Sequence, residues 1–468
     1  MSIKFEYSEN SLIIEDEMSK KPNFLIIAID TLRADHLGCY GYDQPTSPFI
    51  DNMAEKSVLY ENCYSHAPWT IPSFTSLFSG LDPICSRIVG SPWNVPNYKN
   101  IHFNDLALTL PEIMREAGYL TFAIDNLVEM ASHPSWFVRG FRTYINLTDK
   151  LFLRHHHLLA EQVTDEMIAW HDLKAEKPWF AFLHYWDPHL PYNYPKRYDE
   201  LLKSYRPKPV KTSCGRDYLL HRGLANDISN KYTELIAQYD RSILYLDNEL
   251  QRLFDVLETF GVLEDTVVII LGDHGEAMVE HGVLFDHSLL YDPTIHVPLI
   301  IYDPRTKQSS RVKDFAQHHD ILPTICTLAE IEPKSPVTGQ PLQPFGTSPP
   351  RDFIVSTQDG GEAMRAILTH DWKMICHYDL EQTACRRPAK IKKTELYDLK
   401  NDPFELTDLS EILPDIALTL STKLESWRIN LMRQTDINDP LLDKHLRINF
   451  KDYPGDPVLV EFYRSLTT

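Results

Sequence analysis

Short apolar runs in this chain are each followed by a residue that can bind a metal or transfer a proton. The runs, in chain order, are residues 23–29, 179–183 and 266–271. Continuous runs of this length are typical of strands buried on both faces of a parallel sheet. Asp30, His184 and Asp273 follow these runs, the last of them after one glycine. Because ligands bind outside the carboxyl ends of the strands in open α/β sheets, these three positions predict a site.

Helical spacing separates the predicted strands. Over residues 233–257 the apolar positions recur at the interval of an amphipathic helix. Strands that alternate with helices predict the α/β class, here a doubly wound, mostly parallel sheet with helices on both faces. We expect residues 1–345 to form this domain, because a proline-rich linker lies between residues 341 and 350.

The pattern changes after the linker. Alternating apolar and polar residues at 366–369 and 372–375 predict a small antiparallel sheet, and a helical pattern covers residues 413–433. We expect residues 346–468 to form a smaller α+β subdomain.

Composition narrows the range of partners. The formal net charge of −20 over 468 residues disfavours nucleic acid and anionic membranes, because the long-range field repels polyphosphate. A small anionic substrate is compatible with it, since a metal ion can reverse the charge locally. No run approaches the roughly 20 apolar residues of a membrane span, and residues 1–21 contain no apolar segment of signal-peptide length. We therefore expect a cytoplasmic protein with seven free cysteines; these patterns do not set its oligomeric state.

Residues 67–80, which read Ala-Pro-Trp-Thr-Ile-Pro-Ser-Phe-Thr-Ser-Leu-Phe-Ser-Gly, resemble the nucleophile segment of the sulfatases in the alkaline phosphatase superfamily. The family pattern is Cys-x-Pro-Ser-Arg, followed by an apolar helix that ends in Thr-Gly or Ser-Gly. Aligned on Pro72 and Ser73, the family's cysteine falls on Thr70 and its arginine on Phe74. The family oxidises that cysteine to formylglycine. Threonine cannot undergo this modification, so we expect no formylglycine here.

The ends of two predicted strands resemble the metal-binding motifs of the same family. Residues 30–41 follow the first motif, except that Thr31 stands where a second aspartate is usual, and residues 273–276 follow the second. The residues that the resemblance assigns to one divalent metal ion are Asp30, Thr70, Asp273 and His274. Carboxylates and a hydroxyl suit Ca²⁺, Mg²⁺ or Mn²⁺, whereas the imidazole favours Mn²⁺ or Zn²⁺. For Asp30 alone, the alternative is a cap for the following turn.

Two further segments supply candidate imidazoles. Residues 184–192 resemble the family's Asp-Pro-His-x-Pro-Tyr motif, whose histidine lies beside the leaving or transferred group. On that resemblance His189 is catalytic, Asp187 orients it or binds substrate, and His184 is a second substrate-binding candidate. His287 stands where sulfatases usually have lysine, and its imidazole can serve as a general acid near neutral pH.

The threonine favours a phosphoric over a sulfuric ester. In formylglycine enzymes the sulfated intermediate collapses by elimination from a geminal diol, an exit that a sulfate ester of threonine lacks. Phe74 also weakens the grip on a dianion, which matters less for a phosphodiester or phosphonate monoester. We expect a metal-dependent hydrolase of a small anionic ester, phosphodiester favoured, with Thr70 as nucleophile. The alternatives are a sulfatase and a non-catalytic sulfatase-like binding protein.

Overall fold

Two sheets organise the molecule, which we describe from a computed structural model. The described residues are 21–90, 103–127, 136–146, 158–170, 172–201, 228–283, 285–306, 309–359, 363–378 and 393–442. None of the helices in this part of the chain combines the length and hydropathy that a membrane span requires.

The larger sheet has eight strands in the order β4-β3-β5-β1-β6-β7-β2-β8. Its strands are β1 (Asn23–Ile29), β2 (Val58–Tyr64), β3 (Leu120–Ile124), β4 (Thr143–Ile145), β5 (Trp179–Tyr185), β6 (Thr266–Gly272), β7 (Leu299–Tyr302) and β8 (Ser310–Gln317). All neighbours are parallel except β7, which runs antiparallel to both β6 and β2. The mostly parallel sheet predicted from the apolar runs is confirmed.

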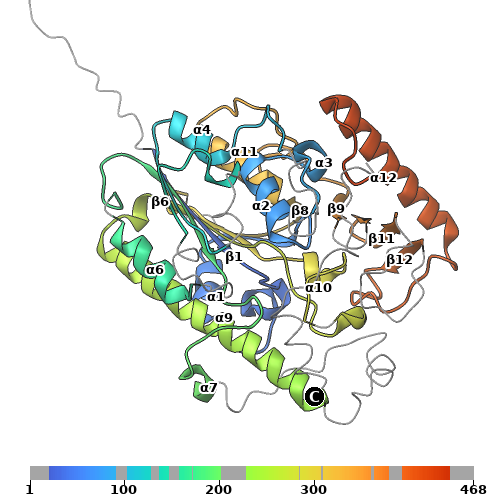
Figure 1. The fold of residues 1–468 in the computed structure, drawn as a ribbon, viewed down its shortest axis with the longest axis horizontal. Coiled ribbons are helices and arrows are strands. Elements are labelled where there is room, and N and C mark those ends of the chain that lie inside the picture. Colours follow the sequence, from blue (N-terminus) through green and yellow to red (C-terminus); the bar gives the residue numbers. More distant parts are fainter. Residues whose placement is uncertain are drawn as a thin grey trace, which may run out of the picture.

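Helices cover both faces of this sheet (Figure 1). The side chains of β1 alternate between two apolar cores, with Leu25 and Ile27 in one and Phe24 and Ile26 in the other. The helices packed in the first core are α1 (Pro48–Ala54), α6 (Ala160–Ala169) and α9 (Ile228–Thr259). Those in the second are α2 (Thr70–Ser79), α3 (Pro83–Ser86), α4 (Leu110–Glu116) and α11 (Ile321–Leu328). The short helix α7 (Tyr198–Leu201) contacts α9.

The smaller sheet is antiparallel, with strand order β12-β11-β10-β9. Its strands are β9 (Ile354–Gln358), β10 (Met364–Leu368), β11 (Trp372–His377) and β12 (Thr394–Asp398). The long helix α12 (Pro414–Thr435) covers its outer face (Figure 1), through Leu420 and Leu424. The inner face packs on the segment around α10 (Asp292–Ile295). The expected antiparallel sheet and terminal helix are therefore present; the domain boundary at residue 345 stays a prediction.

The register of the central strands gathers the predicted site residues at one edge. Ile29 pairs with Tyr185 of β5 on one side and with Gly272 of β6 on the other. The next residue of β1, Asp30, therefore lies beside Asp273, whose N–H donates to the Ile29 carbonyl at 3.3 Å. Parallel strands place their carboxyl ends at a common edge, which is why distant segments of sequence meet here.

Candidate metal centre

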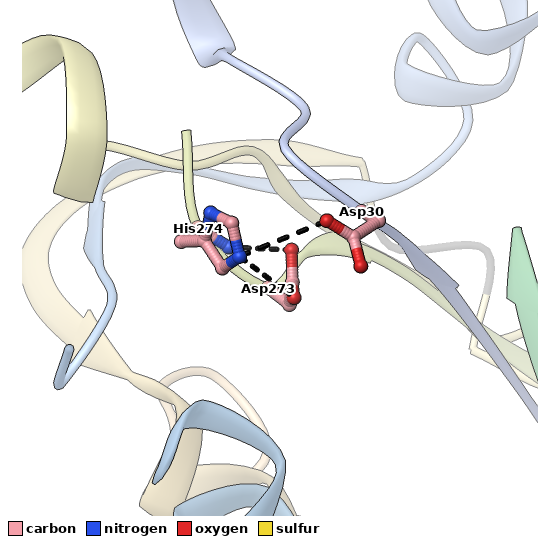
Figure 2. Close-up of side chains that lie close together, drawn as sticks. All are labelled: Asp30, Asp273 and His274. Carbon is pink, nitrogen blue, oxygen red and sulfur yellow. Dashed lines mark hydrogen bonds and ion pairs between the residues drawn. The ribbon is translucent and has the colours of Figure 1, made fainter. Parts of the chain in front are cut away.

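Asp30, Asp273 and His274 point toward one another at the carboxyl edge of the large sheet (Figure 2). All three side chains are fully buried. The Nε2 atom of His274 lies 3.7 Å from Asp30 Oδ1 and 3.4 Å from Asp273 Oδ2. Neither of these carboxylate oxygens has a hydrogen-bond donor among the described residues. Two buried acceptors and one imidazole nitrogen thus share a single space.

The protonation of His274 suits it for binding a cation. Its Nδ1–H donates to the Gly275 carbonyl at 3.0 Å, which leaves the lone pair of Nε2 facing the two carboxylates. Burial, reinforced by the neighbouring His287, lowers the pKa of His274 to about 3. A neutral imidazole whose other nitrogen is fixed by a backbone carbonyl is the arrangement that metal-binding histidines adopt.

Backbone donors turn the Asp273 carboxylate toward the same space. Its Oδ1 atom accepts hydrogen bonds from the N–H groups of Thr31 at 3.1 Å and His274 at 2.7 Å, so Oδ2 is the atom left for the centre. Thr31 makes its bond from a left-handed backbone conformation with φ +52°, which is unusual for a β-branched residue. Burial and then the nearby Asp30 carboxylate raise the pKa of Asp273 well above its ordinary value.

Thr70 joins the cluster from helix α2, which packs on one face of the large sheet. It is the first residue of α2, where the helix dipole favours negative charge. Its Oγ1 atom donates to Asp30 Oδ2 at 3.3 Å and lies 3.2 Å from His274 Nε2. The structure therefore brings together all four residues predicted to bind the metal.

This donor set fits a divalent cation. Buried carboxylate oxygens without donors are costly unless a cation neutralises them. Asp30, Asp273 and His274 offer ligand atoms within 4.8 Å of one another, and the Thr70 hydroxyl adds a fourth donor. The hydroxyl of Thr31 is buried with no partner among the described residues, so the position of the family's second aspartate holds a neutral group.

Two further imidazoles lie at the border of the cluster. The ring centroid of His287 is 4.6 Å from that of His274, 4.5 Å from Trp69 and 5.5 Å from His189. Burial opposes a charge on His287, but the Glu276 carboxylate, 3.8 Å from Nδ1, outweighs it and raises the pKa to about 9. His189 donates Nδ1–H to the Leu190 carbonyl at 2.8 Å, which leaves its Nε2 available.

The structure contradicts the expected contacts of His184 and the orienting role of Asp187, whereas the substrate-binding role of Asp187 stays a prediction. His184 lies within β5 and is fully buried, with Nδ1 3.0 Å from Asp125 Oδ1 and Nε2 3.2 Å from Asp30 Oδ2, so neither nitrogen can bind substrate. Asp187 does not orient His189; its Oδ1 atom accepts from the N–H of Ala160 at 2.9 Å, at the start of α6. Burial opposes protonation of His184, but its hydrogen bonds to Asp125 and Asp30 raise its pKa to about 10.

Sequence reasoning missed a second set of contacts that fixes α2 to the sheet. Ser73 Oγ contacts the Asp273 carbonyl at 2.7 Å and His318 Nδ1 at 2.9 Å, and His318 Nε2 donates to the Gly272 carbonyl at 2.8 Å. Ser73 lies three residues after Thr70 and so shares its helix face. This helical spacing from Thr70 was the sequence feature that could have identified Ser73 as a neighbour of the centre. Asp125 was missed too, although it also follows an apolar strand.

Comparison with known proteins agrees with this geometry. Residues 22–331 match the family model described as Sulfatase, and residues 279–430 match one described as N-sulphoglucosamine sulphohydrolase, C-terminal. A Δ4,5-hexuronate-2-O-sulfatase of Bacteroides thetaiotaomicron is 24% identical, with 84% of this chain and 86% of that protein covered. An arylsulfatase of Clostridium perfringens is 25% identical, with 83% and 90% covered.

Solved structures show the same fold. The phosphonate monoester hydrolase of Agrobacterium radiobacter superposes with a TM-score of 0.70 at 20% identity, covering 88% of this chain and 96% of that one. The predicted α/β class with its additional small sheet is thereby confirmed. Since the Sulfatase model spans most of the chain, from the first strand of the large sheet to α11, the protein belongs to the sulfatase family of the alkaline phosphatase superfamily.

Proposed function

We propose that this member of the sulfatase family is a metal-dependent hydrolase of a phosphodiester or phosphonate monoester, with Thr70 as its nucleophile. Relatives named as sulfatases and a structural neighbour named as a phosphonate monoester hydrolase support an ester hydrolase that acts on sulfuric or phosphoric esters. The observation that carries the finer proposal is the Thr70 hydroxyl, which lies between Asp30 and His274 where the family motif has the formylglycine-forming cysteine. A threonine ester of phosphate is released by attack of water at phosphorus, whereas a threonine sulfate lacks the elimination route of a geminal diol.

The charge around the centre supports a substrate with one negative charge. Within the described structure, the hydrogen bonds and ion pairs of Asp30, Asp273 and His274 involve no lysine or arginine. At the position of the family's arginine, the ring of Phe74 packs edge-on against Phe182 instead. A dianionic group would therefore find one metal ion and imidazoles here, but no guanidinium fork.

The residues of the chain divide the reaction between them. Asp30 Oδ2 accepts the hydrogen bond of Thr70 Oγ1 and takes its proton as this oxygen attacks phosphorus. The bond from phosphorus to the leaving alcohol breaks, and His287, protonated at neutral pH, gives that oxygen a proton. Water then attacks phosphorus in the phosphothreonine, the bond from phosphorus to Thr70 Oγ1 breaks, and Asp30 returns its proton to Oγ1, which restores the hydroxyl. His189 Nε2, left unoccupied by the Nδ1 hydrogen bond, is the candidate acceptor of the proton that the water loses. A divalent ion held by Asp30, Thr70, Asp273 and His274 would supply Lewis-acid stabilisation of the developing charge.

A sulfuric ester is the second candidate, because the curated relatives that match most of the chain are named as sulfatases. A non-catalytic binding protein is opposed by the cluster itself. Its four candidate ligands converge, and His189 and His287 border them.

A substrate screen tests the proposal. Bis(4-nitrophenyl) phosphate, an aryl phosphonate monoester, 4-nitrophenyl phosphate and 4-nitrophenyl sulfate would each be assayed with Mn²⁺, Ca²⁺, Mg²⁺ and Zn²⁺. We expect metal-dependent turnover of the diester or phosphonate. Turnover of the sulfate alone would reverse the preference for phosphorus, and no turnover of any ester with any metal would favour the binding protein.

A further inference from the structure

Asp125 follows the last residue of β3 and is a buried carboxylate whose two oxygens both have hydrogen-bond partners. His184 lies between it and Asp30 of the metal centre. Its Oδ2 atom accepts from the Tyr144 hydroxyl at 2.7 Å and from Asn146 Nδ2 at 3.0 Å. Its Oδ1 atom accepts from the Leu127 N–H at 3.2 Å and lies 3.0 Å from His184 Nδ1. Donors on three sides hold this carboxylate in place, so it can fix the ring that it contacts.

His184 connects that fixed carboxylate to the centre. Its Nε2 atom is 3.2 Å from Asp30 Oδ2, the oxygen turned away from Asp273 and His274. Aromatic side chains enclose the ring: Phe74 packs against it edge-on with centroids 4.9 Å apart, and Trp186 lies 5.8 Å away. The imidazole is completely buried, which shields both of its hydrogen bonds from water.

We propose that His184, held by Asp125, is a positioning residue that orients Asp30 for metal binding. By engaging Oδ2, His184 leaves Oδ1 of Asp30 facing His274 and the Asp273 carboxylate. Where the family motif has arginine this chain has Phe74, which packs against His184, and His184 on β5 contacts Asp30. Residues that hold a metal ligand in this way typically change metal affinity by about 10–100-fold. The inference rests on the metal centre of the proposed function, but not on the identity of the ester.

Titration with MnCl₂ alone, followed by the EPR signal of free Mn²⁺, tests this role. His184→Phe preserves an aromatic ring among aromatic neighbours and removes both hydrogen bonds. Asp125→Asn preserves an acceptor for His184 but removes the charge. The matched control is His377→Phe, which breaks a buried histidine–carboxylate contact, 2.9 Å to Glu395, in the small sheet. Thermal unfolding of each variant shows whether it is folded.

We expect His184→Phe to weaken Mn²⁺ binding by at least about tenfold, with Asp125→Asn between it and the wild type. His377→Phe should lower the melting temperature and leave the Mn²⁺ affinity unchanged. Unchanged or tighter binding in folded His184→Phe would overturn the positioning role while the proposed function stands. If His184→Phe does not fold, wild-type affinity in Asp125→Asn would overturn the role equally. If Mn²⁺, Ca²⁺, Mg²⁺ and Zn²⁺ all fail to raise the melting temperature of the wild type, both proposals are overturned.

Discussion

Two buried clusters of charge in this protein differ in how they are satisfied. At the junction of the two sheets, Lys373 Nζ of β11 lies 2.9 Å from Asp292 Oδ1 of α10 and 2.5 Å from Glu405 Oε1. Lys373 is fully buried, and its single cation lies between these two carboxylates. At the metal centre, Asp30 Oδ1 and Asp273 Oδ2 face a neutral imidazole and have no donor within the described residues.

A neighbouring carboxylate at the junction repeats the contrast. Glu395 accepts from the Tyr291 hydroxyl at 2.6 Å and the Tyr397 hydroxyl at 2.5 Å, and its other oxygen lies 2.9 Å from His377 Nε2. These side chains complete one another and fasten the small sheet to the segment that carries His287. Buried carboxylates that a side-chain cation or hydroxyl already contacts serve the fold, whereas buried acceptors that face one point without a cation or donor form a candidate cation site.

The largest effect is expected from removing the hydroxyl at the metal centre. Thr70→Val keeps the shape of the side chain and should lower kcat at least about a thousandfold, because the nucleophile is gone. Thr70→Ser should retain most of the activity. Thr75→Val on the same helix serves as the control. The Thr75 hydroxyl donates to the Ile71 carbonyl and accepts from Trp136 Nε1, and neither residue belongs to the metal centre. Steady-state kinetics with the best ester of the screen would decide, and more than a tenth of wild-type kcat in Thr70→Val would exclude the nucleophilic role.

Breaking the self-satisfied cluster should cost stability instead. Lys373→Met leaves the fully buried Glu405 carboxylate and the partly buried Asp292 carboxylate without their cation. We therefore expect the free energy of unfolding, measured by urea titration, to fall by about 3–5 kcal/mol. Lys334→Met makes the same substitution in an exposed ion pair with Glu116, whose lysine side chain is 63% exposed, and should change stability by about 0–1 kcal/mol. Equal effects of the two substitutions would show that the buried ion pairs of Lys373 stabilise the fold no more than the exposed ion pair of Lys334.

Replacing one carboxylate in each cluster distinguishes a residue that binds metal from one that stabilises the fold. Asp273→Asn should weaken Mn²⁺ binding about a hundredfold or more, since a direct ligand matters at least as much as the residues that support it. The rise in melting temperature that Mn²⁺ gives the wild type should then disappear. Asp292→Asn alters a partly buried carboxylate of the junction, 25% exposed, and should keep that rise in full. Loss of the Mn²⁺ effect in both variants would argue against two separate roles.

The smallest effect concerns Asp187, a buried carboxylate with one unpartnered oxygen in the described structure. Burial, opposed by the Ala160 N–H, raises its pKa to about 7. A raised carboxyl pKa stabilises the fold below the unfolded pKa of about 3.9, and this contribution is lost as pH rises toward 7. Relative to Asp187→Asn, the wild type should therefore lose about 2 kcal/mol of stability between pH 5 and pH 8. Urea unfolding at both pH values measures it, and a constant difference would show that Asp187 does not titrate in this range.

The apolar runs predicted the central strands and the convergence of the metal ligands. They could do so because parallel strands place their carboxyl ends at one edge of the sheet, and the pairing of β1 with β6 then makes Asp30 and Asp273 neighbours. The resemblance supplied Thr70, whose segment has no strand pattern of its own.

The remaining contacts depend on pairings that local patterns do not encode. His184 looked like a substrate ligand because it stood at a strand end, but β5 continues through Tyr185 and buries it between Asp30 and Asp125. Asp187 looked like the partner of His189, but its carboxylate instead accepts a hydrogen bond from the Ala160 N–H at the start of α6. The junction of Lys373 with Asp292 joins residues 81 positions apart, for which spacing gives no signal.

The most direct test is a crystal structure of the protein soaked in MnCl₂, with data collected at the manganese absorption edge. We expect an anomalous peak within coordination distance of Asp30 Oδ1, Asp273 Oδ2 and His274 Nε2, with Thr70 Oγ1 beside it, and no peak at Lys373. Density that shows these side chains ordered without a peak, or a peak at the junction instead, would contradict the proposal that the cluster of Asp30, Asp273, His274 and Thr70 is incomplete without a cation.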